Sequence, residues 1–176
     1  ELNPDIAEAH NNLGNILKHR GNLKEAEICQ CKAIQLNPDF AQAHSNLGNI
    51  YRELGKLKEA ESSYRKATEI KPDFADAHSN LGSILKDLGK LEEAEISFSK
   101  SIELNPDNNS ALLGRAKLFF DKEEFDKALI DADSKKDEFY KGSMDTKILR
   151  VFSLEILYKL GRVEEIYERI KKMSKL

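Results

Sequence analysis

The apolar positions of the chain follow a helical spacing that glycine and proline interrupt at short intervals. In the segment 41–54, apolar residues recur three and four positions apart, which predicts an amphipathic helix. Gly55 ends this pattern, because glycine readily adopts the left-handed conformation that terminates helices. A second apolar stripe covers 57–70 and stops before Pro72, whose ring disfavours a helical residue in front of it. The short connection between the two stripes predicts an antiparallel pair of helices.

This pattern returns with a fixed period of 34 residues. The prolines that are followed by aspartate keep this period at Pro4, Pro38, Pro72 and Pro106. The glycines that end the first helix of each pair keep it at Gly21, Gly55 and Gly89. Repetition at such a period is typical of stacked helical hairpins. We therefore expect three regular repeats in 7–108, preceded in 1–6 by the end of another repeat of a longer protein.

Small and aromatic residues share the facing sides of the two predicted helices. Gly48 and Ala60 are small, so the two backbones can approach closely, and Tyr51 and Tyr64 fill the wider space beside them. One hairpin cannot bury its apolar surface alone. Successive hairpins should therefore stack into a continuous core.

These residues resemble the signature of the tetratricopeptide repeat family. In the second copy the matching positions are His44, Leu47, Gly48, Tyr51, Ala60, Tyr64 and Pro72. The first copy departs from the family pattern at Gln30, where an aromatic residue is expected. The repeats are similar to the arrays of O-linked N-acetylglucosamine transferase-like proteins. The resemblance implies an all-α fold, a right-handed superhelical α-solenoid of antiparallel helix hairpins whose first helices line the concave side.

The C-terminal part of the chain departs from the regular period. Residues 109–142 form a degenerate fourth repeat, in which Glu123 replaces the glycine after the first helix. Residues 143–176 form an out-of-phase helical hairpin, because Gly161 lies 72 and not 68 residues after the last regular glycine. We place an insertion and an irregular connection near 135–145.

The predicted helix 146–160 is apolar on most of its faces, which favours burial on more than one side. It can serve as a cap that packs on the fourth repeat or as a surface for a second molecule. The second alternative makes the chain a self-association module, with a homodimer as its simplest form. The candidate interface residues are Ile148, Phe152 and Ile156.

Polar stripes recur on the side of each first helix that faces away from the core. A ladder of asparagines is the clearest of them, since Asn12, Asn46 and Asn80 are each one period apart. An amide side chain both donates and accepts, so a ladder can bind the N–H and C=O groups of an extended peptide. The alternative is that these asparagines solubilise the surface or bond to the next helix. The candidate ligand-binding residues are Asn12, Asn15, Asn46, Asn49, Arg52, Asn80, Ser83, Lys86 and Lys117.

A second binding mode of the family, the carboxylate clamp, captures the C-termini of chaperones and needs lysine and arginine at set concave positions. In this chain those positions carry Asn11, Ser45, Gln42 and Asp76. Because these cations are missing, we do not expect a carboxylate clamp.

Several other functions find no support in the sequence. The net charge is −3, and the first helices lack regular base-reading or stacking side chains, so nucleic acid is not an expected partner. No apolar stretch approaches the roughly 20 residues of a membrane span. No nucleophile motif or glycine-rich phosphate loop occurs, so we expect neither an enzyme nor a cofactor. The acidic residues lie on solvated faces or, like Asp39 and Asp73, at helix starts where they can cap free N–H groups.

The cysteines and histidines do not form a metal site either. Cys29 and Cys31 point about 200° apart on a helix, so they should neither pair with each other nor share a metal. His10, His44 and His78 stand on successive hairpins roughly 10 Å apart, too far to share a zinc ion. We expect them to pack between helices with one nitrogen hydrogen-bonded. Without a disulfide framework, we expect a reducing, cytoplasmic location.

The sequence thus predicts a protein–protein interaction scaffold that binds a peptide or protein segment in a concave groove. Self-association through the C-terminal apolar helix is one alternative. Another is a substrate-recruiting domain within a larger enzyme of the glycosyltransferase type.

Overall fold

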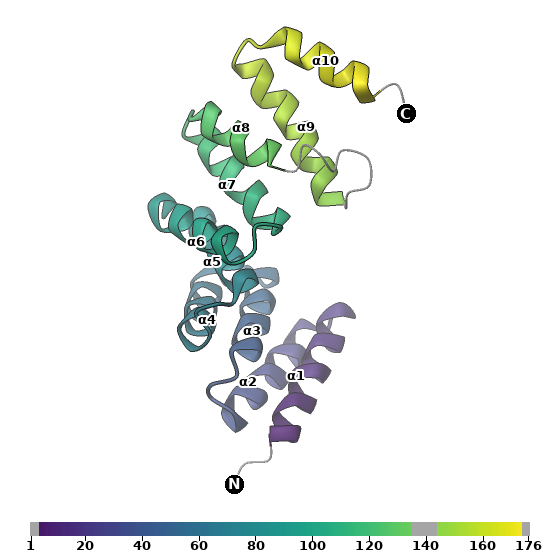
Figure 1. Ribbon diagram of the computed structural model, residues 1–176. Helices are drawn as coiled ribbons and strands as arrows, with labels where there is room; N and C mark the ends of the chain where they lie inside the picture. Colours follow the sequence, from purple (N-terminus) through teal and green to yellow (C-terminus); the bar gives the residue numbers. More distant parts are fainter. Residues whose placement is uncertain (1–3, 135–143, 174–176) are drawn as a thin grey trace. The chain divides into compact units, whose positions relative to one another are not determined.

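The computed structural model of the chain describes residues 4–134 and 144–173. Ten α-helices occupy these two ranges, and no strand occurs within them (Figure 1). The chain divides into two compact units, Glu1–Pro106 and Asp107–Leu176. The all-α helical-repeat fold predicted from the sequence is confirmed.

The first unit contains three helical hairpins. Its helices are α1 (Pro4–His19), α2 (Leu23–Leu36), α3 (Ala41–Glu53), α4 (Leu57–Ile70), α5 (Ala75–Asp87) and α6 (Leu91–Leu104). Helices α3 and α4 agree with the two predicted stripes within one residue. Helix α1 begins at Pro4, so residues 4–6 of the segment expected to end a preceding repeat belong to its first turn, and residues 1–3 lie outside the described residues. Proline is tolerated there, because the N–H that it lacks would have no partner within the helix.

The second unit contains α7 (Asn109–Asp121), α8 (Phe125–Asp133), α9 (Met144–Lys159) and α10 (Val163–Met173). The helix predicted over 146–160 thus begins two residues earlier and ends one residue earlier. The insertion and the irregular connection expected near 135–145 fall largely on 135–143, which lie outside the described residues.

The two helices of a regular repeat approach each other most closely at a glycine. A Cβ atom on Gly48 would lie 2.7 Å from Cε1 of Tyr64, and one on Gly82 would lie 2.8 Å from Cδ1 of Phe98. Real Cβ atoms do not come this close to a ring, so only glycine fits here. Both aromatic rings are fully buried. The close approach predicted from the small residue at position 48 is therefore confirmed.

The first repeat replaces the aromatic ring by an amide. Gln30 is fully buried, and its Nε2 would lie 2.6 Å from a Cβ on Gly14. Its Nε2 donates to the backbone oxygen of Asn11 over 3.0 Å. Its Oε1 is buried and has no hydrogen-bond partner. A buried acceptor without a partner costs free energy, so the first repeat carries a polar defect that the second and third repeats lack.

The turn after each first helix has the same backbone conformation in all five hairpins. The residue with positive φ is Gly21, Gly55, Gly89, Glu123 and Gly161 in turn. At Glu123 the φ angle is 61°, although a side chain disfavours this conformation. These five residues therefore show which positions of the five hairpins correspond in sequence, including those of the last hairpin, which departs from the 34-residue period.

Histidine and aspartate residues near the starts of α3 and α5 differ in whether they form the predicted hydrogen bonds. His44 donates from Nε2 to the backbone oxygen of Pro38 over 2.9 Å, and His78 contacts Pro72 in the same way over 3.0 Å, as expected of histidines with one nitrogen satisfied. The expected capping by Asp39 and Asp73 is wrong. Helices α3 and α5 begin after Phe40 and Phe74, one residue later, without a side-chain cap.

Helix α9 packs within the second unit. Leu149, Ile156 and Leu157 are buried, and the ring of Phe152 lies 5.2 Å from the ring of Phe120 on α7. The packing of this helix on the fourth repeat, one of the two predicted alternatives, is thus realised within the unit.

An arginine on the last helix ties the C-terminal hairpin to the fourth repeat. The guanidinium of Arg169 on α10 contacts both carboxylate oxygens of Asp133 at 2.6 Å and the hydroxyl of Ser153 at 2.9 Å. Such a bidentate pair fixes geometry as well as contributing energy. The last hairpin is thus held in place by a specific polar contact in addition to its apolar core.

We predict that Gln30→Phe raises the free energy of unfolding of the first unit by about 1–2 kcal/mol, because it removes the buried acceptor that has no partner. The ring has room, since Phe98 occupies the equivalent place beside Gly82. The reciprocal change Phe98→Gln should cost about 3 kcal/mol. Urea unfolding followed by circular dichroism measures both values. A destabilised Gln30→Phe variant would contradict this account of the core.

We also predict that Glu123→Gly stabilises the second unit by about 1 kcal/mol. The left-handed conformation costs a side-chain-bearing residue roughly 1–2 kcal/mol, and the greater freedom of glycine in the unfolded chain offsets part of this gain. The matched control is Gly89→Glu, at a turn where a Cβ would meet open space. This change should lower the free energy of unfolding of the first unit by about 1 kcal/mol, because it places a side chain in the left-handed conformation. Differential scanning calorimetry that finds the same sign for both changes would show that this turn is not strained.

Candidate ligand-binding face

The first helices of the three regular repeats lie next to one another. Helix α1 contacts α3, and α3 contacts α5, so their outward sides form one face. Ion pairs link the second helices of successive repeats: Lys56 lies 3.1 Å from Glu27, and Lys90 lies 2.7 Å from Glu61. Burial alone would raise the pKa of Glu61, but hydrogen bonds from Lys90 and Arg65 hold it below its usual value. Glu61 therefore stays ionised at neutral pH, and the repeats are stabilised on the side opposite to the face.

Asn46, the central member of the predicted ladder, is buried. Its Nδ2 donates to Oδ1 of Asn11 over 2.8 Å, and its Oδ1 accepts from Gln42 over 3.1 Å. Asn11 in turn donates to Oδ1 of the exposed Asn12 over 3.3 Å. Asn46 therefore links two repeats and orients its neighbours. For this asparagine, the predicted alternative of a bond to another helix is the correct one.

Two further asparagines are each oriented by a buried donor on the second helix of their own repeat. The hydroxyl of Tyr64 donates to Oδ1 of Asn49 over 2.9 Å. Burial raises the pKa of Tyr64 to about 12, so this hydroxyl stays protonated at neutral pH. One period earlier, Nε2 of Gln30 donates to Oδ1 of Asn15 over 3.4 Å. In both repeats the amide oxygen is engaged inside, which leaves the NH2 group of each half-buried asparagine as a donor at the face.

The third repeat carries different groups at these positions. Phe98 stands where Tyr64 stands in the second repeat and has no donor. Ser83 takes the place of the asparagine and donates to the backbone oxygen of Ser79 over 3.1 Å. Asn80 is half-buried and forms no hydrogen bond through its side chain with any described residue. The oriented donors are thus confined to the first two repeats.

The charged candidates are spread over the same side of the first helices. Arg52 is exposed, and Lys86 is half-buried and has a polar partner. Lys117 is exposed on α7, in the second unit. Of the three interface candidates, Ile148 is exposed, Phe152 is half-buried, and Ile156 is fully buried in the core of its unit. Ile156 therefore supports the packing of α9 and is not accessible to a partner.

The residues that hold the face in place are not evident from the sequence. Asn11 and Tyr64 contact asparagines that lie 35 and 15 residues away, and neither spacing is visible as a pattern within one helix. The role of Gln30 could have been inferred from the sequence. Gln30 occupies the aromatic position of the repeat, and its side chain is long enough to reach an amide on the other helix of the pair.

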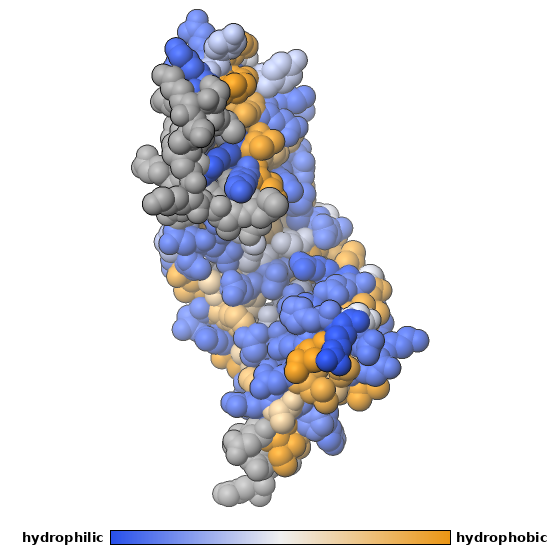
Figure 2. Space-filling view, turned by 90° about the vertical axis from the view of Figure 1, so that its right-hand side faces the viewer, coloured by the Kyte–Doolittle hydropathy of each residue, from blue (hydrophilic) through white to orange (hydrophobic). Residues whose placement is uncertain are grey.

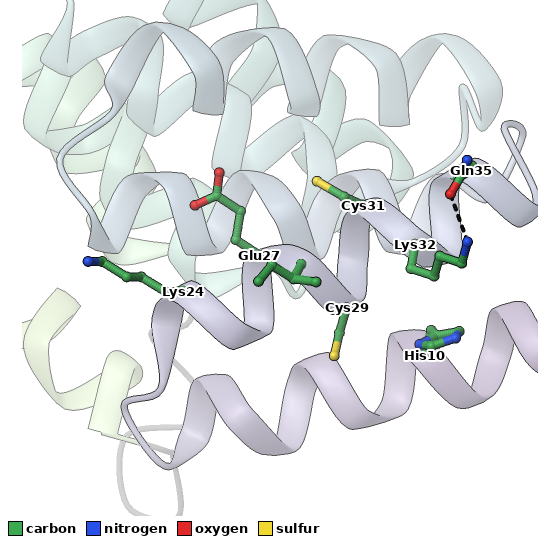
Figure 3. Close-up of a pocket in the computed structure, with 8 residues that line it drawn as sticks. His10, Lys24, Glu27, Cys29, Cys31, Lys32 and Gln35 are labelled. Carbon is green, nitrogen blue, oxygen red and sulfur yellow. Dashed lines mark hydrogen bonds between the residues drawn. The ribbon is translucent and has the colours of Figure 1, made fainter.

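An open groove of about 880 Å³ lies along α2, away from the asparagines (Figure 3). Its lining residues are His10, Lys24, Glu27, Ile28, Cys29, Cys31, Lys32 and Gln35. Lys32 donates to Gln35 over 2.9 Å, and Glu27 pairs with Lys56. Cys29 and Cys31 are free thiols and point to opposite sides of the helix, as their spacing predicts. Of its polar groups, Lys32 and Gln35 engage each other and Glu27 engages a residue outside the lining, so this groove is not our candidate site.

No three His, Cys, Asp or Glu side chains within residues 4–134 and 144–173 are arranged to hold a metal ion. In that same part of the chain, no helix combines the length and the apolar character that crossing a membrane requires.

Family models match the repeats one after another. Models described as tetratricopeptide repeat match residues 7–40, 32–62 and 75–108, and a model described as TPR repeat matches residues 48–89. Together these matches span 7–108. The comparison with curated proteins found no match.

Solved structures share the fold of the chain. The first TPR of Spaghetti (RPAP3), bound to the HSP90 peptide SRMEEVD, is 26% identical, with a TM-score of 0.67 over 69% of this chain and 97% of that one. The second TPR domain of human RPAP3, in complex with the HSP70 peptide SGPTIEEVD, is 26% identical, with a TM-score of 0.63 over 66% of this chain and 98% of that one.

A third similar structure is a mutant of the O-GlcNAc transferase of Thermobaculum terrenum. It is 24% identical, with a TM-score of 0.70 over 75% of this chain and 26% of that one, and it supports the fold alone. The 34-residue period, the close approach of each helix pair at a glycine and the family matches lead to the same conclusion. The chain belongs to the tetratricopeptide repeat family.

Proposed function

We propose that the chain is a protein-interaction module that binds an extended polypeptide segment along α1, α3 and α5. The observation that carries this proposal is the fixed orientation of Asn15 and Asn49, whose oxygens accept from Gln30 and Tyr64. Their NH2 groups are therefore presented as donors in two successive repeats. Groups that are already oriented lose less conformational entropy on binding, which favours a ligand that supplies acceptors.

The backbone of an extended peptide supplies such acceptors. Each peptide unit carries a C=O group, and it does so whatever the side chain is. Donors repeated along a face can therefore bind a chain segment along its length with little dependence on its sequence. Asn12 and Asn80 extend the same side of the first helices, whereas Asn46 acts as a positioning residue through Asn11 and Gln42.

The similar structures support a peptide as the class of partner. The two RPAP3 domains are in complex with peptides that end in the sequence EEVD. In this chain the positions that the carboxylate clamp fills with cations carry Asn11, Ser45, Gln42 and Asp76. We therefore propose recognition of backbone carbonyls by amides and not capture of a C-terminal carboxylate. A substrate-recruiting role within a larger enzyme stays a prediction.

The double variant Asn15→Asp/Asn49→Asp tests this proposal. Aspartate keeps the oxygen that accepts from Gln30 and Tyr64 but replaces the outward NH2 donor by a second acceptor. We expect the affinity for a fluorescein-labelled pool of random-sequence dodecapeptides, measured by anisotropy, to fall at least about tenfold. The melting temperature should change little, because the internal hydrogen bonds remain.

Asn22→Asp is the matched control, and the double variant Asn22→Asp/Asn12→Asp is compared with it. Asn22 is exposed in the turn between α1 and α2, so its change alters the charge away from the face and should leave the affinity unchanged. Adding the change at Asn12 should weaken binding, because Asn12 lies on the face. If Asn15→Asp/Asn49→Asp bound the pool as tightly as the unaltered chain does, the face would not be the binding site.

A further inference from the structure

A second groove lies in the C-terminal unit, between α7 and α9. It has a volume of about 390 Å³ and is lined by Lys117 of α7 and by Lys147, Ile148, Val151, Phe152 and Glu155 of α9. In the upper part of Figure 2, hydrophobic side chains form a stripe with hydrophilic side chains along its right-hand side. All six lining residues belong to one compact unit.

The turns with positive φ show which part of the repeat this groove occupies. Counting nine residues back from Gly21, Gly55 and Gly89 leads to the asparagine ladder, and nine back from Gly161 leads to Phe152. Phe152 therefore stands at the ladder position of the last hairpin. Counting thirteen residues back from the same glycines places Ile148 in line with Glu8, Gln42 and Asp76. The C-terminal hairpin thus presents apolar groups on the side where the N-terminal repeats present amides and acids.

The apolar part of the groove is accessible, and aromatic rings pack behind it. Val151 is 65% exposed and Ile148 is 40% exposed. Phe152 is held from behind by its contact with Phe120 on α7, whose ring also lies 5.3 Å from that of Phe125 on α8. An apolar floor with exposed aliphatic walls favours burial of one bulky apolar side chain, at about 25 cal/mol for each Å² removed from water.

The charged groups of the groove are available to a ligand. Lys117 and Lys147 are exposed, and neither has a hydrogen bond or an ion pair with a described residue. The carboxylate of Glu155 likewise has no such partner, and it lies two helical turns beyond Lys147 along α9. The formal charge of the lining is therefore +1, with one cation on each of the two helices. An apolar floor with cations beside it complements an apolar side chain next to a carboxylate.

We propose that this groove binds a short peptide segment in which a bulky apolar residue adjoins an acidic residue. The apolar side chain lies on Phe152 between Ile148 and Val151, and the carboxylate pairs with Lys147 or Lys117. This site differs in chemistry from the amide face of the first unit and does not depend on it. The chain would then hold two recognition sites, one tolerant of sequence and one selective for acidic and apolar side chains.

The test uses the whole chain and a fluorescein-labelled peptide, Gly-Ser-Glu-Asp-Leu-Phe-Gly-Ser-Gly. Two matched peptides replace either the acidic pair by Lys-Lys or the apolar pair by Ser-Ser. In ¹⁵N–¹H NMR titrations followed at the signals of α7 and α9, we expect the first peptide to bind with a dissociation constant below about 1 mM and each matched peptide to bind at least about tenfold more weakly. Any shifts in α1, α3 and α5 should be the same for all three peptides, because the amide face tolerates different sequences.

Two variants with matched controls assign the effect to the groove. Val151→Asp and Lys147→Glu should each weaken binding at least about tenfold. Ile130→Asp alters an equally exposed apolar residue on α8 outside the groove, and Lys159→Glu makes the same charge change at the far end of α9. Both controls should bind as the unaltered chain does. Circular dichroism confirms that the variants remain folded.

Three outcomes would overturn this proposal. The first is the absence of any shift in α7 and α9 at about 1 mM peptide. The second is equal binding of the Lys-Lys peptide, which would show that the cations play no part. The third is a dimer in light scattering that Val151→Asp dissociates, because the occupant of the groove would then be a second copy of the chain. None of these outcomes bears on the amide face, whose own test uses Asn15 and Asn49.

Discussion

The close approach of two helices at a glycine is the constraint on which the rest of the first unit depends. Tyr64 and Phe98 lie so near Gly48 and Gly82 that a single methyl group would collide with the ring. Because the pairs are this close, a long polar side chain on the second helix can reach past the glycine to the outward side of the first helix. The hydroxyl of Tyr64 does so and bonds to Asn49. The geometry of the core thus sets the orientation of groups on the candidate face.

This coupling explains why the first repeat tolerates a glutamine at an aromatic position. Gln30 leaves its Oε1 without a hydrogen-bond partner inside the protein, which costs stability, but its Nε2 reaches Asn15. The core defect and the oriented amide are two consequences of one side chain. Phe98 shows the opposite arrangement, since it fills the core well and orients nothing at the face. At this position Gln30 orients an amide at a cost to the core and Phe98 fills the core alone, whereas Tyr64 does both.

The repeat fold could be predicted from the sequence because its determinants are local and recur. Glycine at the turns, proline between repeats and the apolar spacing of 41–54 and 57–70 each act within a few residues, and three copies agree. The burial of Asn46 could not be predicted, because its partner Asn11 lies in another repeat and an exposed and a buried asparagine look alike in sequence. The capping by Asp39 and Asp73 was wrongly predicted, because α3 and α5 begin at Ala41 and Ala75 and their N-cap residues are Phe40 and Phe74.

We propose that buried donors orient Asn15 and Asn49 so that their NH2 groups receive a peptide. The most direct measurement follows the side-chain amide signals of both residues by ¹⁵N–¹H NMR while unlabelled random-sequence dodecapeptides are added. The account predicts that the NH2 signals of Asn15 and Asn49 shift together and saturate, while that of Asn22 stays in place. Shifts confined to the groove along α2 or to α7 and α9, with the two asparagine signals unmoved, would contradict it.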